Sequence, residues 1–428
     1  MELQLVSMLF CIIIVGSAMG SFTGLVPGIH VNTLAAIMLG SYPLIESALG
    51  SLAPPEWIPV LVASWVVSAS VVHSFVDFVP SVFLGAPGPE DILNILPGHR
   101  MLLQGQGMDA VSAAAVGSLV GAVAATALAL PLFLLMQEGG EGTMAAVTPY
   151  VLLSTLLLLV LTEDGGHDRL WALLLMALSG LLGYLCMHAS LPEWHLMDGG
   201  SMMLPLLTGL FGMPAMLLSV QGGPLPPQRT PSQVHGHPMP ALKGLLAAAM
   251  VGWFPGITAT AGTVVACVTS PEREPARFIS MVASVGTAST VFTLVTLAVS
   301  GNGRSGTMIA VGEVMGGSLP GQGLLTLCIL LFAVLLSSLL GYLATLTSGL
   351  AMARSMGGAD LHRISSAVMA FMVLLVAAMT GPSGLLVLLT GTVMGLIPTA
   401  VGVNRVHLAS CMLLPVFLIY TGLDPMTV

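Results

Sequence analysis

Long apolar runs alternate with short polar turns along nearly the whole chain. A membrane-spanning helix needs about 20 consecutive apolar residues, so runs of this length predict crossings of a bilayer. By this criterion we count about 10 to 12 transmembrane segments, which together predict an all-α polytopic membrane protein. The runs begin near Leu3, Ile58, Val111, Val147, Leu170, Leu204, Leu242, Phe278, Leu324, Ala367, Leu385 and Val406.

The composition excludes a soluble domain and a nucleic-acid-binding protein. Hydrophobic residues make up 56% of the 428 residues and charged residues only 7%, whereas a soluble domain carries roughly 25% charged residues. The ten Lys and Arg residues are scattered and form no basic patch for nucleic acid. The start of the chain, Met1 to Gln4, lacks the basic residues of a secretory signal. We therefore expect the first apolar run to be retained in an integral protein of the cytoplasmic membrane.

A Gly-x-x-Pro-Gly-Ile motif occurs twice, once in each half of the chain. The first copy spans Gly24 to Ile29 and the second spans Gly252 to Ile257, so the copies are separated by more than half of the chain. Helix-breaking residues at corresponding places in two hydrophobic halves point to a substrate site. The candidate binding residues at the two motifs are Pro27, Gly28, His30, Asn32, Thr33, Pro255, Gly256, Thr258, Thr260 and Thr263.

A helix that ends inside the membrane offers free backbone N–H groups at the start of the next half-helix. These groups carry a partial positive charge of roughly half a unit, which suits a carboxylate or a phosphate. We interpret the two motifs as broken, re-entrant helical hairpins whose facing ends bind an anion with more than one charge. The alternative is that each Pro-Gly pair is only a kink in a crossing helix.

A second pair of breaks follows the motifs. No normal helix continues through Gly85 to Pro89, and non-helical backbone at this depth is tolerated only inside protein or against a water-filled cavity. In the second half, Gly301 to Ser305 occupies the corresponding place. Arg304 there, and Arg405 later, either meet an anionic substrate or extend to water at the interface. The candidate binding residues of this second pair are Gly85, Pro87, Gly88, Asn302, Arg304 and Ser305.

His73 and Asp77 are four residues apart in an apolar run, so on a helix they share one face. An ionisable pair inside a membrane helix is a functional hypothesis by default, because a charge there is costly. The pair is a candidate for ion coupling, with H⁺ or Na⁺ as the coupling ion. The alternative is that Asp77 caps a segment that starts near Pro80 at the membrane edge.

The order of elements is shared by the two halves: a helix, a Pro-Gly hairpin, a helix, a Gly-rich break and long apolar helices. We predict a first membrane repeat over residues 1–222, a Pro-rich linker over 223–240 and a second membrane repeat over 241–428. The scattered basic residues leave open whether the repeats are parallel or inverted.

Motifs of enzymes and metal sites are missing from the sequence. It contains no Gly-x-x-x-x-Gly-Lys-Ser/Thr phosphate loop, no His-Glu-x-x-His zinc pair and no Gly-x-Ser-x-Gly nucleophile turn. The five cysteines lie singly, which favours packing roles over metal or redox chemistry. We therefore expect no catalytic residue, no metal ligand and no cofactor.

At these motifs the sequence resembles the TctA-like family, the large membrane subunit of tripartite tricarboxylate transporters. The family's Gly-x-x-Pro-Gly-Leu/Ile motif is matched at Gly24–Ile29 and again at Gly252–Ile257. Its Pro-Gly segment, which runs into a polar Gly-rich stretch and an Ala/Gly-rich helix, is similar to residues 86–107. The chain departs from the family at Ser300–Ser305, where Pro is lost and Arg is gained, and at His30, which replaces a small residue.

The resemblance implies a carboxylate importer that works with a small membrane subunit and an extracytoplasmic binding protein. Our first hypothesis is an ion-coupled secondary transporter for a di- or tricarboxylate-like organic anion. The alternative is a translocase, or flippase, for an anionic lipid carrier such as a polyprenyl phosphate, because the same helix ends suit a phosphate head group. A third class is a membrane scaffold that transports nothing, or an intramembrane enzyme.

Overall fold

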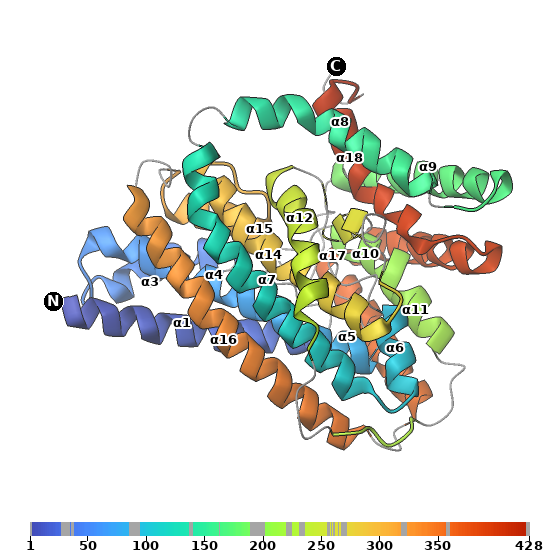
Figure 1. Cartoon of the computed structure of the whole chain (residues 1–428), viewed down its shortest axis with the longest axis horizontal. Coiled ribbons are helices and arrows are strands. Elements are labelled where there is room, and N and C mark those ends of the chain that lie inside the picture. Colours follow the sequence, from blue (N-terminus) through green and yellow to red (C-terminus); the bar gives the residue numbers. More distant parts are fainter. Residues whose placement is uncertain are drawn as a thin grey trace.

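The computed structural model of the chain is built of helices packed into one body (Figure 1). It describes residues 2–26, 35, 38–84, 95–136, 140–161, 163–188, 202–219, 225–230, 236–254, 257, 259, 262–263, 265–266, 272–317, 323–356 and 360–424. No strand occurs among these residues, so the all-α fold class is confirmed.

The helices in chain order are α1 (Glu2–Leu25), α3 (Tyr42–Leu49), η1 (Pro55–Trp57), α4 (Ile58–Val76), α5 (Phe78–Leu84), α6 (Ile95–Leu103), α7 (Gly107–Met136), α8 (Gly140–Leu161), α9 (Gly166–His188), α10 (Met203–Leu207), η3 (Thr208–Gly212), α11 (Met213–Ser219), α12 (Pro238–Trp253), α14 (Pro275–Ser300), α15 (Gly306–Val314), α16 (Gly323–Ser355), α17 (Leu361–Val401), η5 (Arg405–Ala409) and α18 (Ser410–Thr421).

Seven helical segments in the described part of the chain are long and apolar enough to cross a membrane. Three shorter apolar helices accompany them, so the predicted number of about 10 crossings is reached only when these are counted. Two of the seven segments, Pro55–Leu84 and Pro275–Ser300, are 89% buried, which places them in the interior of the bundle. The first span, Leu3–Leu25, is only 22% buried and lies at the outside.

Glycines set the contact between α1 and α4. Gly16, Gly20 and Gly24 are spaced four apart on one face of α1, and each lies against the backbone of α4. A β-carbon on Gly16 would lie 2.7 Å from the carbonyl oxygen of Trp65, and one on Gly20 would overlap the carbonyl oxygen of Ala69. Small residues at this spacing allow two membrane helices to approach closely.

The contact between α12 and α14 in the second half has the same character. A β-carbon on Gly244 would lie 2.7 Å from the carbonyl oxygen of Met281, and one on Gly252 would overlap Phe292. The hydroxyl of Ser284 donates a hydrogen bond of 2.6 Å to the carbonyl of Ala241. In each half, therefore, the helix that leads into a Pro-Gly motif packs closely on a buried helix.

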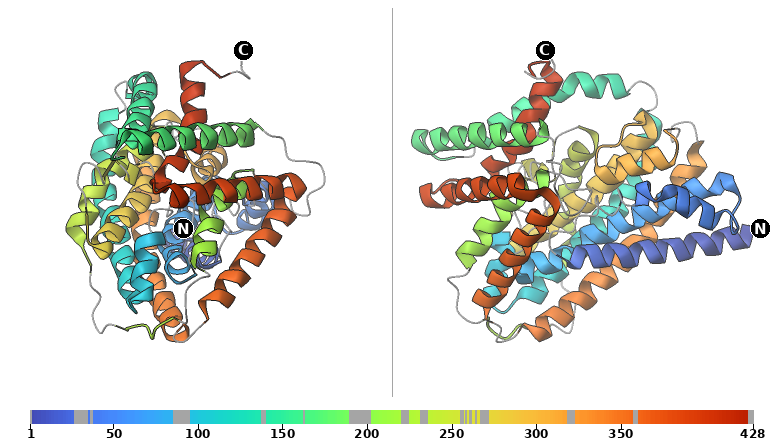
Figure 2. Two further views of the ribbon diagram at one scale, coloured as in Figure 1. Left: turned by 90° about the vertical axis from the view of Figure 1, so that its right-hand side faces the viewer. Right: turned by 180° about the vertical axis from the view of Figure 1, so that it is seen from behind.

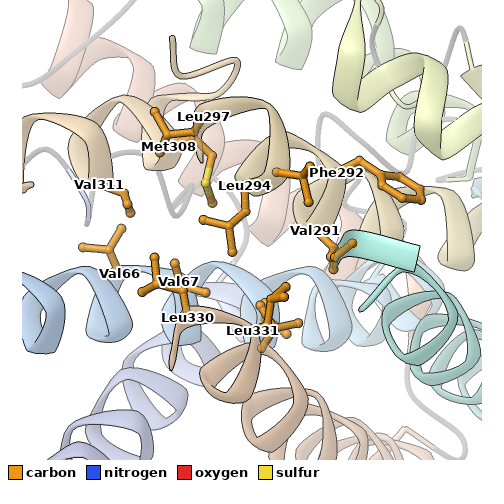
Figure 3. Packing of buried hydrophobic residues seen from close by; sticks show 14 of the residues in the cluster. Val66, Val67, Val291, Phe292, Leu294, Leu297, Met308, Val311, Leu330 and Leu331 are labelled. Atoms are coloured by element: carbon orange, nitrogen blue, oxygen red, sulfur yellow. The ribbon is translucent and has the colours of Figure 1, made fainter. Parts of the chain in front are cut away.

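The long helix after each buried helix packs across to the other half. On α7, Gly121 lies against Ser284 of α14, and on α16, Gly341 lies against Phe75 of α4. The main hydrophobic core forms where α4, α14, α15 and α16 meet (Figure 3). Val66 of α4 lies beside Val311 of α15 in this core, and Val67 lies beside Leu330 of α16.

A second packed group is formed by α8, α9, α10, η3, α11, α17, η5 and α18. α18 contacts both α8 and α9, and α17 contacts η3 and α11. These helices gather on one side of the molecule, away from α1 and α3 (Figures 1 and 2). Two hydrophobic clusters hold the group together, and Cys186 and Cys411 pack in one of them as free thiols. Cys11 and Cys328 are exposed.

Two elements differ in their limits from the sequence pattern. α12 begins at Pro238, so the last three residues of the predicted 223–240 linker are helical. Its prolines fit because the first turn of a helix has no internal partner for their missing N–H groups. α17 is interrupted at Gly381, whose φ of 62° only glycine adopts readily. The division into two membrane repeats stays a prediction.

Candidate functional site

Most of the predicted hairpin residues lie outside the described residues. These are Pro27, Gly28, His30, Asn32, Thr33, Gly85, Pro87, Gly88, Pro255, Gly256, Thr258 and Thr260. The described candidates are His73, Asp77, Thr263, Asn302, Arg304 and Ser305. The described part of the site consists of the helix ends that lead into the motifs and of the residues packed against them.

The last turn of α1, directly before the first motif, rests on the end of α4. A β-carbon on Gly24 would lie 3.0 Å from the carbonyl oxygen of His73 and 3.2 Å from the backbone nitrogen of Asp77. The hydroxyl of Thr23 lies 3.0 Å from Nδ1 of His73, at hydrogen-bonding distance. The first motif thus begins beside the predicted coupling pair.

His73 and Asp77 are both buried, with exposed fractions of 6% and 8%. Asp77 follows the last residue of α4 and directly precedes α5, and its N–H donates to the carbonyl of His73. Asp77 therefore stands at the start of α5, as the capping alternative expects. However, it lies inside the 89% buried span Pro55–Leu84 rather than at the end of a span. The pair occupies the interior. An ionisable group is energetically costly there, so its presence favours a functional role.

The start of α15 approaches α4 close to this pair. Ser305 caps α15, because its hydroxyl accepts a hydrogen bond of 3.3 Å from the N–H of Met308. The same hydroxyl lies 3.0 Å from the hydroxyl of Thr307, which in turn lies 3.4 Å from the hydroxyl of Ser70 on α4. A row of three hydroxyls therefore leads from the second half to the turn of α4 before His73.

Arg304 is a partly buried cation next to Ser305. Its Nη1 donates a hydrogen bond of 3.3 Å to the hydroxyl of Tyr420 on α18. Its Nε is buried, and no described residue accepts a hydrogen bond from it. No carboxylate in the described part of the chain forms an ion pair with this guanidinium. By contrast, Arg405 donates from Nη2 to the Thr399 hydroxyl over 2.9 Å.

The second motif begins between α14 and the peripheral helices. The hydroxyl of Thr296 donates a hydrogen bond of 2.9 Å to the carbonyl of Gly252 in the last turn of α12. Beyond the break, Ile257 packs in a cluster with Leu152 of α8 and Leu413 of α18. Thr263 is fully buried, and its hydroxyl has no hydrogen-bond partner among the described residues. Asn302, by contrast, is exposed and hydrogen-bonds locally to Ser300.

The structure brings together some of the predicted residues and adds others. His73 contacts Thr23, and Ser305 is linked through Thr307 to Ser70, which lies on α4 one turn before His73. The sequence pattern does not single out Thr23, Ser70 or Thr307. Isolated Ser and Thr residues are common in membrane helices, where their hydroxyls bond to the preceding turn, so sequence alone gives no reason to select them. The arrangement offers hydroxyls and a guanidinium to an anion, and an imidazole and a carboxylate to a cation.

A metal centre of three or more His, Cys, Asp or Glu side chains does not occur among the residues with described positions. The pair of His167 and Asp168 is 3.4 Å apart, and the His167 side chain is 78% exposed, so this pair lies in a solvated turn. The neighbouring Glu163 is not exposed. It is buried, and its carboxylate lies 2.7 Å from Nε2 of His407.

Comparison with known proteins gives two matches. The model of the tripartite tricarboxylate transporter TctA family matches residues 10–410. An uncharacterized protein, MJ1079, of Methanocaldococcus jannaschii is 27% identical over 310 residues, which cover 70% of this chain and 71% of that protein. No solved structure matches the chain.

Proposed function

The chain belongs to the tripartite tricarboxylate transporter TctA family, and we propose that it moves a di- or tricarboxylate across the membrane by coupling to an ion gradient. The family is one of transporter subunits rather than of enzymes, and the seven apolar helical segments make the chain an integral membrane protein. The cytoplasmic membrane is the proposed location.

One observation carries the proposal for the site. The helix before each Pro-Gly motif packs through a glycine on one of the two most buried spans of the molecule, Gly24 on α4 and Gly252 on α14. Both motifs therefore begin directly against the most buried of the described spans. Backbone that leaves the helix at such a place is stable only when other polar groups or a ligand satisfy it. This supports a binding site at the two motifs, as in other transporters with broken helices.

The proposed substrate contacts come from both motifs and from the loop before α15. The half-helices predicted after Pro27-Gly28 and Pro255-Gly256 would supply backbone N–H groups, and Arg304 and Ser305 would supply side-chain donors. His73 and Asp77 form the proposed coupling site for H⁺ or Na⁺. No further cofactor is part of the proposal.

A tripartite transporter has two further components. We propose that a small membrane subunit and an extracytoplasmic binding protein work with this chain, because its family is defined by such three-part systems.

The proposal is tested by reconstituting the full chain in proteoliposomes, with its companion subunits added in a parallel set. Uptake of radiolabelled citrate and of C4 dicarboxylates is measured under an inward Na⁺ or proton gradient. We expect uptake of at least one carboxylate that collapses when the gradient is dissipated. Absence of carboxylate uptake, together with transbilayer movement of a fluorescent polyprenyl phosphate, would instead support the lipid translocase.

A further inference from the structure

We propose that the two Pro-Gly motifs bind ligands of opposite charge: the first motif takes the coupling cation and the second takes a carboxylate group of the substrate. This inference rests on the proposed function and refines it. In the proposed function both motifs contact one anion. Here the two motifs are instead two sites, one for a cation and one for an anion.

The two motifs lie in equivalent surroundings. A β-carbon on Gly24 would lie 3.1 Å from Cβ of Val76 and 3.2 Å from the nitrogen of Asp77. A β-carbon on Gly252 would meet Cβ of Phe292 and lie 3.1 Å from the nitrogen of Thr293. In each half, then, the glycine faces the side chain of one residue and the backbone nitrogen of the next. Val76 therefore corresponds to Phe292, and Asp77 corresponds to Thr293.

The equivalence extends along both helix pairs. Gly16 faces the carbonyl of Trp65 and Cβ of Ser68, whereas Gly244 faces the carbonyl of Met281 and Cβ of Ser284. The sequence separation between Trp65 and Met281 is the same as that between Asp77 and Thr293, so the register between the two buried helices is constant. The pairs α1–α4 and α12–α14 can therefore be compared position by position.

The comparison shows side chains of different charge at corresponding positions. In this register His73 corresponds to Ser289, and Asp77 corresponds to Thr293. All four side chains are buried, with exposed fractions between 6% and 8%. The ionisable pair of the first motif is thus replaced by two neutral hydroxyls at the second.

The sequences that follow the two buried helices continue this difference. When the same register is extended beyond the buried helices, Gly88 corresponds to Arg304, while Glu90 and Asp91 correspond to Gly306 and Thr307. The first half therefore carries acidic residues in this part of its sequence, and the second half carries a basic one. Arg304 is the partly buried cation that lacks a carboxylate partner among the described residues. It donates to Tyr420 of α18, and Leu413 of the same helix packs in one cluster with Ile257 of the second motif, which places Arg304 on the side of that motif.

Electrostatics makes this division effective. A substrate carboxylate about 6 Å from an ionised Asp77 would be repelled, which lowers its affinity about a hundredfold at an effective dielectric constant of about 20. A cation at the same place gains by a similar factor. At the second motif the preference is reversed. The guanidinium of Arg304 attracts an anion and repels a cation, and the hydroxyls there are neutral hydrogen-bond donors.

A physical link between the two sites is present. The hydroxyls of Ser305, Thr307 and Ser70 connect the residue next to Arg304 with the turn of α4 before His73, through contacts of 3.0 and 3.4 Å. A cation at the first motif and an anion at the second would attract each other across this row. Binding of either ligand would then favour binding of the other.

The test is equilibrium binding of radiolabelled citrate to the purified full chain over a series of Na⁺ and proton concentrations. In the wild type we expect a citrate affinity that rises with one of these cations. Asp77→Asn should make the citrate affinity independent of that cation, at the value of the cation-free wild type. Arg304→Gln should weaken citrate binding at least tenfold at every cation concentration while keeping the cation's enhancement factor.

Exposed residues of the same types serve as controls. Asp168→Asn and Arg363→Gln should match the wild type, because their side chains are 40% and 86% exposed and lie outside the proposed sites. If Asp77→Asn does not yield a monodisperse protein, His73→Gln replaces it with the same expected loss of cation dependence.

The inference is overturned if Arg304→Gln keeps the wild-type citrate affinity, or if the Asp77 variant keeps its cation dependence. It is also overturned if both variants lower citrate affinity equally at every cation concentration. In these cases the wild type still binds citrate, so the proposed function stands. A wild type that binds no carboxylate under any condition would contradict both.

Discussion

The hydroxyl of Thr23 lies 3.0 Å from Nδ1 of His73, and this contact joins the helix before the first Pro-Gly motif to the buried helix α4. Both residues are buried, with exposed fractions of 5% and 6%. A polar contact at this depth orients the imidazole in a defined direction. An ion-dependent change at His73 would therefore reach the end of α1 through this contact.

Thr23→Val is expected to reduce the factor by which the cation raises citrate affinity, by about three- to tenfold. The reason is that one buried hydrogen bond contributes about 1 kcal/mol. Thr23→Ser keeps the hydroxyl and should stay close to the wild type. The hydroxyl of Thr126 bonds only to the carbonyl of Ala122 in its own helix, so Thr126→Val is a matched control. Equal behaviour of the Val and Ser variants at position 23 would contradict a role for this contact.

Gly20→Ala should destabilise the protein by about 1 to 3 kcal/mol, because an added methyl group in a close contact forces the helices apart. The new β-carbon would overlap the backbone oxygen of Ala69, which cannot move independently of α4. Gly40→Ala is the control, since nothing lies within 4 Å of a β-carbon there. Thermal unfolding in detergent distinguishes the two, and equal midpoints for both variants would refute close packing of α1 on α4.

The fold class and the long helices follow from local pattern, so the sequence predicts them well. For example, the Ala- and Gly-rich run from about Val111 to Met136 corresponds to α7, Gly107–Met136. The packing partners do not follow from local pattern. α7 packs on α14 of the other half because Gly117 and Gly121 allow contact with the backbone of Ser280 and Ser284. Glycines at this spacing show a close contact but not which helix provides it.

The site was predictable only in part for a related reason. An ionisable pair such as His73 and Asp77 is conspicuous in an apolar run, because a charge in the membrane is costly. The partners Thr23 and Ser70 are ordinary hydroxyl residues whose importance arises only from tertiary contact. The burial of Glu163 does not follow from local sequence, because its neighbours Asp164 and His167 favour a surface turn.

Glu163 and His407 form a buried contact between the α8–α9 turn and η5. The Glu163 carboxylate also accepts a hydrogen bond of 2.9 Å from the N–H of Asn404. Glu163→Ala should therefore cost about 1 to 3 kcal/mol of unfolding free energy, because it leaves the buried imidazole and the N–H of Asn404 without their acceptor. The Glu163→Ala/His407→Ala double variant should cost less than the sum of the two single variants.

Chemical or thermal unfolding of these four proteins in detergent measures the coupling. Asp168→Ala is the exposed control and should change stability by less than about 0.5 kcal/mol. Additive effects of the Glu163 and His407 substitutions would show that the contact contributes no coupling energy.

Glu272 links α12 and α14 in a pH-dependent way. Arg277 donates a hydrogen bond of 2.8 Å to its carboxylate and Lys243 one of 2.6 Å. The hydrogen bond from Arg277, followed by that from Lys243, lowers the pKa of Glu272 below its usual value of 4.5. A lowered pKa stabilises the fold above the unfolded-state pKa, and this contribution is lost as the pH falls through the folded-state pKa.

Glu272→Gln should accordingly be less stable than the wild type at pH 7, by roughly 1 kcal/mol for a partly exposed ion pair. The difference should begin to shrink as the pH falls below the unfolded-state pKa of the carboxyl, and it should be lost once the wild-type carboxyl is protonated in the folded state as well. Unfolding midpoints at several pH values check this. A difference that grows towards acid pH would show that the sign is wrong.

The central claim is that the two Pro-Gly motifs form the binding site for an organic carboxylate and its coupling cation. The most direct measurement is the citrate affinity of the purified chain with leucine at Gly28 or at Gly256, compared with Gly40→Leu as a control with open space around the residue. We predict that both motif variants bind citrate at least tenfold more weakly than the wild type. Gly256→Leu should have the lower citrate affinity of the two, and the control should match the wild type. Wild-type citrate affinity in both motif variants would contradict the account.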